Sequence, residues 1–283
     1  MNKVIHLFGI LILTSCTNYG QLTFITDLPK KIDESSGIVT LNHSDYWLIE
    51  DSGNKDEIYK LNQQGEILKT LEVKNAKNHD WEDLTKDEKG NIYIGDFGNN
   101  QNKRKNLSIY KIPNPDTEQG DKIKAKKIKF YYPEQKKFPP KKEEFLYDAE
   151  AFFYNNDSLY IITRNRAIPF TGVSSIYKIP AKKGEHKAEK IGSFIPCDTA
   201  PNCQITSADI SPDGKTIVLL SNDKLWVYTN FKNENFSLNK STTIHLHNNT
   251  QLESVCFLND STLLLTDERN HGSGGNLYSY KLE

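Results

Sequence analysis

The sequence repeats one pattern five times, and this repeat limits the possible folds more than any other feature. In each copy a Ser or Glu precedes a short apolar strand, a turn follows, and a second strand ends on a polar residue. We call the residues before the first strands the anchors, and they are Ser36, Glu82, Glu150, Ser207 and Glu253. The second strands end on Asp51, Asp96, Arg164, Ser221 and Asp267, each 14 or 15 residues after its anchor. Such constant spacing predicts a β-hairpin that recurs as one structural unit.

Further strand patterns follow each hairpin. An Ile-Tyr-Lys motif at 58–60, 109–111 and 176–178, with related aromatic motifs in the last two units, indicates a third strand. More polar fourth strands are indicated at 67–73, 126–132, 190–195 and 242–246. The fifth unit ends without a fourth strand, and residues 22–26 can supply it. We therefore predict an all-β chain that forms a five-bladed β-propeller of four-stranded antiparallel blades, with the last blade closed by the N-terminal strand.

The first residues have the pattern of an export signal. Lys3 precedes an apolar run at 4–13 that is too short to span a bilayer as a helix. The run ends in Leu13-Thr14-Ser15-Cys16, which resembles the lipobox of bacterial lipoproteins. We predict a signal peptide over 1–16, lipidation at Cys16, a tether over 17–21 and one propeller domain over 22–283. The alternative is an ordinary secretory signal in which the cysteine occurs by chance. With the lipid anchor, the protein would be held at a membrane of the bacterial cell envelope and face the periplasm or the exterior.

The other cysteines also bear on whether the protein is exported. Cys197 and Cys203 bracket a turn-rich segment, and an exported protein can keep a disulfide, so we predict a bridge between them. The alternative is two free thiols. Cys256 lies in an apolar run, which predicts a buried side chain.

Charge excludes one class of partner. The formal net charge is −1, whereas a nucleic-acid-binding protein is usually clearly basic, so we expect no nucleic-acid partner. Separately, we expect the protein to be a monomer. The most basic region covers residues 122–129 and 136–142. Lysines of this kind usually lie on a solvated outer edge, where they prevent strand pairing. The alternative is contact with anionic surfaces of the envelope.

The propeller geometry predicts a site for a cation. The first strand of each blade lines the channel, so the five anchors should form a ring at one mouth, with the ends of the second strands in a wider ring around it. Glu82, Glu150 and Glu253 would repel one another there, and at least one should have a raised pKa. With the hydroxyls of Ser36 and Ser207 they form a set of hard oxygen donors, which suits Ca²⁺. The alternative is that backbone N–H groups and arginines neutralise the glutamates.

Other polar residues are expected at the same mouth. Arg164, Arg166 and Arg269 follow second strands and are candidates for binding a phosphate or carboxylate group. The alternative is that each arginine bridges a neighbouring acid of the ring. The sequence contains no nucleophile motif, and the candidates for positioning a catalytic water are Asp51, Asp96 and Asp267. We expect Asp80 and Asp83, next to Glu82, to serve the start of the strand.

The order of the anchors resembles a known family. The five-bladed calcium-activated nucleotidases of the apyrase type place Ser, Glu, Glu, Ser and Glu around a central Ca²⁺, the order that Ser36, Glu82, Glu150, Ser207 and Glu253 have here. The Glu50-Asp51 pair, the Tyr-Ile-Gly at 93–95 and the Arg-x-Arg of Arg164 and Arg166 also match that family loosely. Phytase-like and SdiA-regulated propellers show a similar acidic pattern. The resemblance implies a propeller with Ca²⁺ bound by the anchors and a possible nucleotidase activity.

Two functions are compatible with these features. The first is a lipid-anchored propeller whose Ca²⁺-type site binds an anionic small molecule or a cell-envelope component at the channel mouth. The second is a Ca²⁺-dependent hydrolase of a phosphorylated substrate, in which the ion and the arginines orient the ligand. The absence of a nucleophile motif favours the first function.

Overall fold

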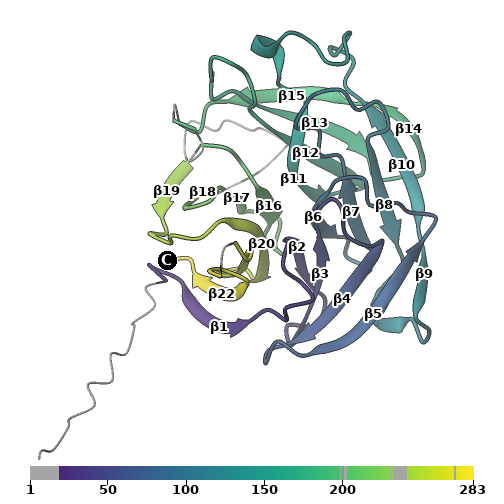
Figure 1. Cartoon of the computed structure of the whole chain (residues 1–283), viewed down its shortest axis with the longest axis vertical. Coiled ribbons are helices and arrows are strands. Elements are labelled where there is room, and N and C mark those ends of the chain that lie inside the picture. The colour runs from purple at the N-terminus through teal and green to yellow at the C-terminus, as the bar shows by residue number, and fades with distance from the viewer. Residues whose placement is uncertain (1–18, 198, 201–202, 230, 232–240, 271) are drawn as a thin grey trace, which may run out of the picture.

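Five β-sheets surround a central channel in a computed structural model of the protein (Figure 1). The structure describes residues 19–197, 199–200, 203–229, 231, 241–270 and 272–283. Within them, helical structure is limited to the 3-10 turns η1 (Pro115–Thr117) and η2 (Lys142–Glu144), and no helix is long and apolar enough to cross a membrane. The predicted five-bladed β-propeller is confirmed.

Each blade is a sheet whose first strand lines the channel. Blade 1 contains β2 (Ser35–Thr40), β3 (Asp45–Glu50), β4 (Glu57–Asn62), β5 (Ile67–Lys74) and β9 (Lys122–Lys124). Blade 2 contains β6 (Trp81–Lys86), β7 (Ile92–Asp96), β8 (Ser108–Ile112), β10 (Lys126–Tyr131) and β14 (Gly184–Lys187). Blade 3 contains β11 (Asp148–Asn155), β12 (Ser158–Arg164), β13 (Ser174–Pro180) and β15 (Glu189–Phe194). Blade 4 contains β16 (Ser207–Ile210), β17 (Ile217–Leu220), β18 (Lys224–Tyr228) and β19 (Ser241–His245). Blade 5 contains β20 (Leu252–Asn259), β21 (Thr262–Asp267), β22 (Asn276–Lys281) and β1 (Thr23–Asp27).

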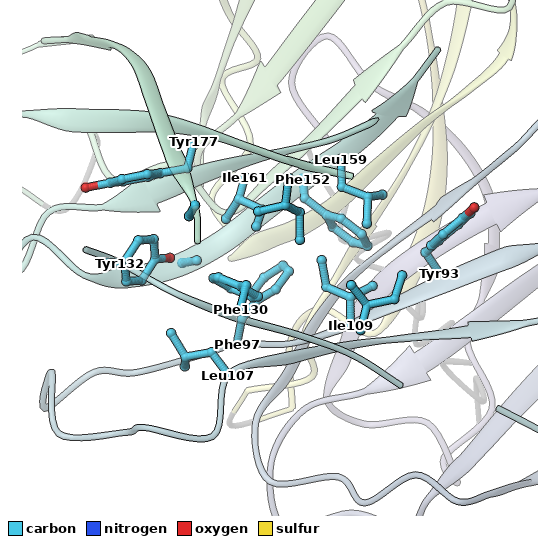
Figure 2. Packing of buried hydrophobic residues seen from close by; sticks show 14 of the residues in the cluster. Tyr93, Phe97, Leu107, Ile109, Phe130, Tyr132, Phe152, Leu159, Ile161 and Tyr177 are labelled. Carbon is cyan, nitrogen blue, oxygen red and sulfur yellow. The ribbon is translucent and has the colours of Figure 1, made fainter. Parts of the chain in front are cut away.

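The apolar core is divided among the five boundaries between blades. Side chains alternate along a strand, so each sheet sends one set of residues to each neighbouring blade. Along β7, Tyr93 packs toward blade 3 and Ile94 toward blade 1. Figure 2 shows the boundary between blades 2 and 3, where Phe97 and Phe152 meet edge to face with ring centroids 5.1 Å apart. Burial on both faces explains why the middle strands are apolar throughout.

Blades 1 and 2 each carry a fifth strand that the sequence did not predict. β9 lies in the connection between β8 and β10 and pairs with β5 in parallel, and β14 comes from blade 3 and pairs with β10 in parallel (Figure 1). The prediction of four strands per blade is therefore wrong for these two blades. For β9, the pairing is explained by Ile123. It is the single apolar residue of this strand, and it is buried against the core between blades 1 and 2.

Side chains of the inner strands bond to the backbone of other inner strands. Asp83 is fully buried in the channel, and its carboxylate accepts hydrogen bonds from Phe152 N of blade 3 (3.2 Å) and Ala208 N of blade 4 (3.3 Å). Nearer the far end of the channel, Asp209 Oδ2 accepts from Phe257 N of blade 5 (2.8 Å). These bonds satisfy N–H groups that the edge of a sheet would otherwise leave unpaired.

The first and last strands close the ring. β1 pairs antiparallel with β22, with Thr23 opposite Ser279 and Asp27 opposite Asn276. This confirms the predicted closure of blade 5 by the N-terminal strand.

The cysteines can be placed except for one. Cys197 and Cys203 form a disulfide in the loop before β16, with their Cα atoms 5.2 Å apart, and Cys256 is a buried free thiol. The predicted lipidation site, Cys16, lies outside the described residues.

Candidate metal centre at the channel mouth

β-Bulges turn four of the five anchors toward the mouth of the channel. The pairing of the first and second strands shifts by one residue at Ser36, Glu82, Glu150 and Glu253. A bulge leaves its residue outside the regular alternation and re-aims the side chain, which is common beside functional sites. The sequence repeat located these residues, but the alternation of strand side chains alone does not predict their direction.

Blade 4 departs from this arrangement. Ser207 pairs regularly with Leu220 and is fully buried in the channel, where its hydroxyl donates to Asp83 Oδ1 (3.0 Å) and accepts from Val255 N (3.1 Å). The hydroxyl of Thr206 instead donates to the carbonyl of Leu252, just before Glu253 (3.0 Å).

Ser36 makes the same bond in blade 1, to the carbonyl of Trp81 just before Glu82 (3.0 Å). Thr206 thus holds the place in the ring that the sequence assigned to Ser207. The sequence offers two adjacent hydroxyls, Thr206 and Ser207, and the spacing could not distinguish them.

Three carboxylates converge between blades 1 and 2. One oxygen each of Asp51, Asp80 and Glu82 lies within 4.8 Å of the others, and we call these residues the acidic trio. Asp51 follows β3, Asp80 precedes β6, and Glu82 is the bulged residue of β6. The prediction for Asp80, a role at the strand start, missed its place in this group. The run of acids around Trp81 was the available signal.

A buried asparagine holds the two halves of the acidic trio together. Asn78 Nδ2 donates to the backbone carbonyls of Glu50 (3.1 Å) and Asp51 (2.9 Å) of blade 1. Its Oδ1 accepts from Trp81 N of blade 2 (3.1 Å). The Asp51 backbone is thereby tied to the residue that precedes Glu82.

A glycine makes room for the acidic trio. A Cβ atom on Gly98 would overlap with Glu82 Oε1 and crowd Asp80 Oδ2. Arg104 lies behind it, with Nη1 bonded to the Gly98 carbonyl (2.7 Å) and Nη2 to Asp96 Oδ1 (2.8 Å). Among the described residues, Arg104 Nη1 forms a loose ion pair with Asp80 Oδ2 of the trio, at 3.9 Å.

Glu150, the anchor of the neighbouring blade 3, is neutralised by protein groups. Arg164 Nη1 lies 2.9 Å from Glu150 Oε2, and Arg166 Nη2 lies 2.9 Å from Glu150 Oε1. Arg166 Nε also bonds to Asp148 Oδ2 (2.7 Å), and Arg164 Nη2 to Gln204 Oε1 (3.3 Å). Two of the three predicted ligand-binding arginines, Arg164 and Arg166, which we call the arginine pair, are therefore bonded to acids at the start of blade 3.

Burial and mutual repulsion raise the pKa values of the other acids. Burial, then the charges of Glu150, Asp51 and Asp80, raise the pKa of Glu82 well above its usual value. Burial is also the main reason why the pKa of Asp51 rises to about 7 and that of Glu253 to about 8. Burial acts on Glu150 in the same direction, but the arginine pair outweighs it and lowers the pKa. The acidic trio thus needs protons or a cation near neutral pH, and Glu150 does not.

The remaining candidates for positioning a water, Asp96 and Asp267, bond to groups of their own blades. Asp96 is fully buried and accepts from Asp80 N (3.2 Å) and Arg104. Asp267 is fully buried and accepts from Asn276 N and Tyr278 Oη, both at 2.7 Å. Both side chains are occupied within their blades, so neither is placed to position a water at the mouth.

Arg269 joins blade 5 to the start of blade 1. Its Nε bonds to Asp33 Oδ1 (2.9 Å) and its Nη2 to the carbonyl of Leu28 (2.8 Å). The structure therefore brings Arg164 and Arg166 together at Glu150 and places Arg269 in a separate set of contacts.

Comparison with known proteins supports the fold. The chain matches no protein-family profile and no curated protein sequence. The PQQ-bound form of an aldose sugar dehydrogenase from Streptomyces coelicolor is similar with a TM-score of 0.56 at 9% identity, over 93% of this chain and 98% of that chain. A gluconolactonase from Xanthomonas campestris gives a TM-score of 0.46 at 13% identity, over 88% of this chain and 72% of that chain. At these identities the likeness concerns the fold alone, and neither protein is a nucleotidase or a phytase.

Proposed function

We propose that the channel mouth binds a divalent cation of the calcium type and, through this ion, an anionic ligand. The observation that carries the proposal is the acidic trio, whose carboxylates lie within 4.8 Å of one another with one loose ion pair recorded among the described residues. Three carboxylates so close together repel strongly, and a divalent cation removes this repulsion.

The donor set fits Ca²⁺ better than a transition metal. Asp51, Asp80 and Glu82 supply carboxylate oxygens, and the nearby ring nitrogen of His79 is already bonded to Asp96 (3.1 Å). Ca²⁺ accepts six to eight oxygens in irregular geometry, so three carboxylates would leave positions for water and for a phosphate or carboxylate oxygen of a ligand. The ion would supply the positive charge that such a ligand needs.

The arginine pair would assist at the edge of this site. The Arg166 side chain is 27% exposed and that of Arg164 is 13% exposed, so an anion at the mouth can reach Arg166 more easily. Both guanidinium groups already bond to Glu150, so we assign the main attraction for the ligand to the ion.

Calcium titration of the unfolding transition tests the site. At about 100 times the dissociation constant, the ion should stabilise the wild-type protein by about 3 kcal/mol. Glu82→Gln should lose most of this gain because it removes a ligand charge and keeps the shape. Glu88→Gln, an exposed acid beyond the other end of β6, should retain the gain. A wild-type protein that responds neither to calcium nor to chelator would sink the proposal.

A hydrolase is the second candidate function. Asp51 belongs to the acidic trio and has a pKa raised to about 7, chiefly by burial, so it is suited to positioning a water beside an ion-bound phosphate. The resemblance of the anchors to calcium-activated nucleotidases and to phytase-like propellers agrees with this role. Nucleoside di- and triphosphates, pyrophosphate and phytate should be screened for calcium-dependent phosphate release, with Asp51→Asn as the loss-of-function variant. Calcium binding without any phosphate release would exclude the hydrolase and retain the binding function.

The place of action is proposed from the sequence and from the disulfide. The lipobox-like segment ending at Cys16 and the bridge between Cys197 and Cys203 both agree with a lipoprotein of the bacterial envelope. Labelling with a radioactive fatty acid in cells should mark the wild-type protein and not Cys16→Ser. Equal labelling of both proteins would exclude this anchor.

A further inference from the structure

A second concave site lies on the outer rim of the propeller, between the outer strands of blades 1 and 2. It is a cavity of about 620 Å³. Its lining includes Lys111, Lys124, Lys126, Lys127 and Lys183, and no Asp or Glu of the described residues lines it. The basic run at 122–129 supplies three of these lysines.

The fifth strands bring these lysines together. Lys124 ends β9, which pairs with blade 1, and Lys126 begins β10 of blade 2 immediately afterwards. Lys183 comes from the turn before β14, the strand that blade 3 contributes to the edge of blade 2. Lysines from three segments of the chain therefore line one hollow.

Most of this charge has no counter-ion in the protein. Lys111 Nζ is paired with Asp87 Oδ2 at 2.8 Å, and Lys127 lies over the ring of Tyr110 at 5.1 Å. For Lys124, Lys126, Lys127 and Lys183, no ion pair is formed with any described residue. Four positive charges around one cavity repel one another, and an anion that bears several negative charges relieves that repulsion.

Protection of sheet edges does not account for the arrangement. Lysines on an edge strand prevent pairing with other chains, which could explain Lys124 on the outer strand of blade 1. β10 is not an edge strand because β14 covers it, and Lys183 lies in a turn. The convergence of lysines from an edge, a covered strand and a turn indicates a binding function instead.

We propose that this cavity binds a small ligand with two or more phosphate or sulfate groups. Cavities of about 300 to 1,000 Å³ hold sugar-sized or drug-sized molecules, so the volume exceeds what one inorganic phosphate needs. The aliphatic parts of the lysines, with Pro113 and Ala125, would contact the body of the ligand, and the amide of Asn75 can add a hydrogen bond. The site is separate from the ion at the mouth and does not depend on it.

The test uses inorganic tripolyphosphate as the probe and two triple variants of equal charge. Binding is measured by isothermal titration calorimetry at low salt with a chelator present, so that no ion at the mouth contributes. Lys124→Gln/Lys126→Gln/Lys183→Gln removes three cavity lysines, and Lys136→Gln/Lys137→Gln/Lys141→Gln removes three from the neighbouring basic loop outside the lining. Lys127 is left unchanged because its ammonium group lies over the ring of Tyr110. Thermal melting checks that both variants fold.

The cavity variant should bind tripolyphosphate at least about tenfold more weakly, and the loop variant should change by less than about twofold. Equal weakening in both variants, or no binding by the wild-type protein, would overturn the proposal. A second arm uses vesicles of about one part phosphatidylglycerol to three parts phosphatidylcholine. Recruitment that the cavity variant alone loses assigns the site to a lipid headgroup, and binding of tripolyphosphate without recruitment assigns it to a soluble ligand.

Discussion

Glu82 and Glu150 occupy the same position in neighbouring blades and have opposite electrostatic surroundings. Both are bulged residues at the start of an inner strand, and both are nearly buried, with 7% and 5% exposure. Glu150 has two arginines and a lowered pKa, whereas Glu82 has other carboxylates as neighbours and a strongly raised pKa. One strand geometry thus supports both an internal ion pair and a candidate cation site.

The difference shows that position in the repeat does not by itself assign a role. The backbone aims the side chain, and the charges of the neighbouring residues decide what that side chain can bind. Arg164 and Arg166 neutralise Glu150, whereas Asp51 and Asp80 bring further negative charge to Glu82. Variants that exchange or remove these neighbours should separate the two halves of the mouth.

The largest effect is expected for Glu150→Gln. It leaves the arginine pair without its shared carboxylate in a largely buried site, so the free energy of unfolding should fall by about 3 kcal/mol. Glu82→Gln, measured with chelator, should leave stability unchanged or raise it by up to about 1 kcal/mol because it removes repulsion. Urea unfolding followed by circular dichroism measures both. Equal destabilisation by the two variants would show that the halves of the mouth do not differ.

The pH dependence of stability should reveal the acidic half. The folded pKa of Asp51 is about 7 and that of Glu253 about 8, both above the values in an unfolded chain, so the folded state retains protons that the unfolded state releases. The contribution of these two groups is therefore complete below their unfolded pKa values and falls as pH rises through the folded ones, by about 2.5 kcal/mol between pH 6.5 and 8.5 with chelator. Saturating calcium should flatten the decline. Stability that increases over this range with chelator would contradict the assignment.

Gly98→Ala should disturb the acidic trio and spare the arginine pair. The added Cβ overlaps with Glu82 Oε1 and crowds Asp80, so we expect about tenfold weaker calcium binding, equivalent to about 1.4 kcal/mol. Gly192→Ala is the matched control, since a Cβ there meets no heavy atom within 4 Å. Calorimetric titration with calcium compares the two. Unchanged affinity in Gly98→Ala would exclude the trio as the binding site.

The smallest effects separate Thr206 from Ser207. Ser207→Ala removes a hydroxyl that bonds to both Asp83 and Val255 N in the channel, so it should cost about 1 kcal/mol or more. Thr206→Val removes the bond to the Leu252 carbonyl (3.0 Å) and a longer one to the Leu220 carbonyl (3.5 Å), and should cost about 0.5 kcal/mol. Urea unfolding with chelator provides the comparison. A greater loss in Thr206→Val would reverse the assignment of the two hydroxyls.

Most of the fold followed from the sequence because each blade carries its own pattern. The repeated anchors with their constant spacing, the turns and the missing fourth strand of the last unit together predicted five blades and their closure. β9 and β14 were not predictable in this way. Each is three or four residues long, and each pairs with a blade other than the one its neighbours in sequence form, so its stability depends on contacts that no local pattern records.

The site was less predictable than the fold. The repeat located Glu82 and Glu150, but their difference depends on Arg166 and Asp80, which lie outside the repeated positions, and on Arg164, which stands where the other units have Asp or Ser. The candidates Asp96 and Asp267 have the right spacing, yet their hydrogen bonds within the blade occupy them. Spacing along the sequence predicts the position of a residue on its strand, but it does not predict which groups its side chain contacts.

The pairing of β1 with β22 also has a consequence for how the chain folds. The two strands lie at opposite ends of the described chain, and blade 5 is incomplete until both are present. Bringing such distant segments together costs more loop-closure entropy than forming any single hairpin. We therefore expect blades 1 to 4 to gain structure while the chain is still being made, and the ring to close last, after the final strand has emerged. Loss of either end should slow or prevent the same final step.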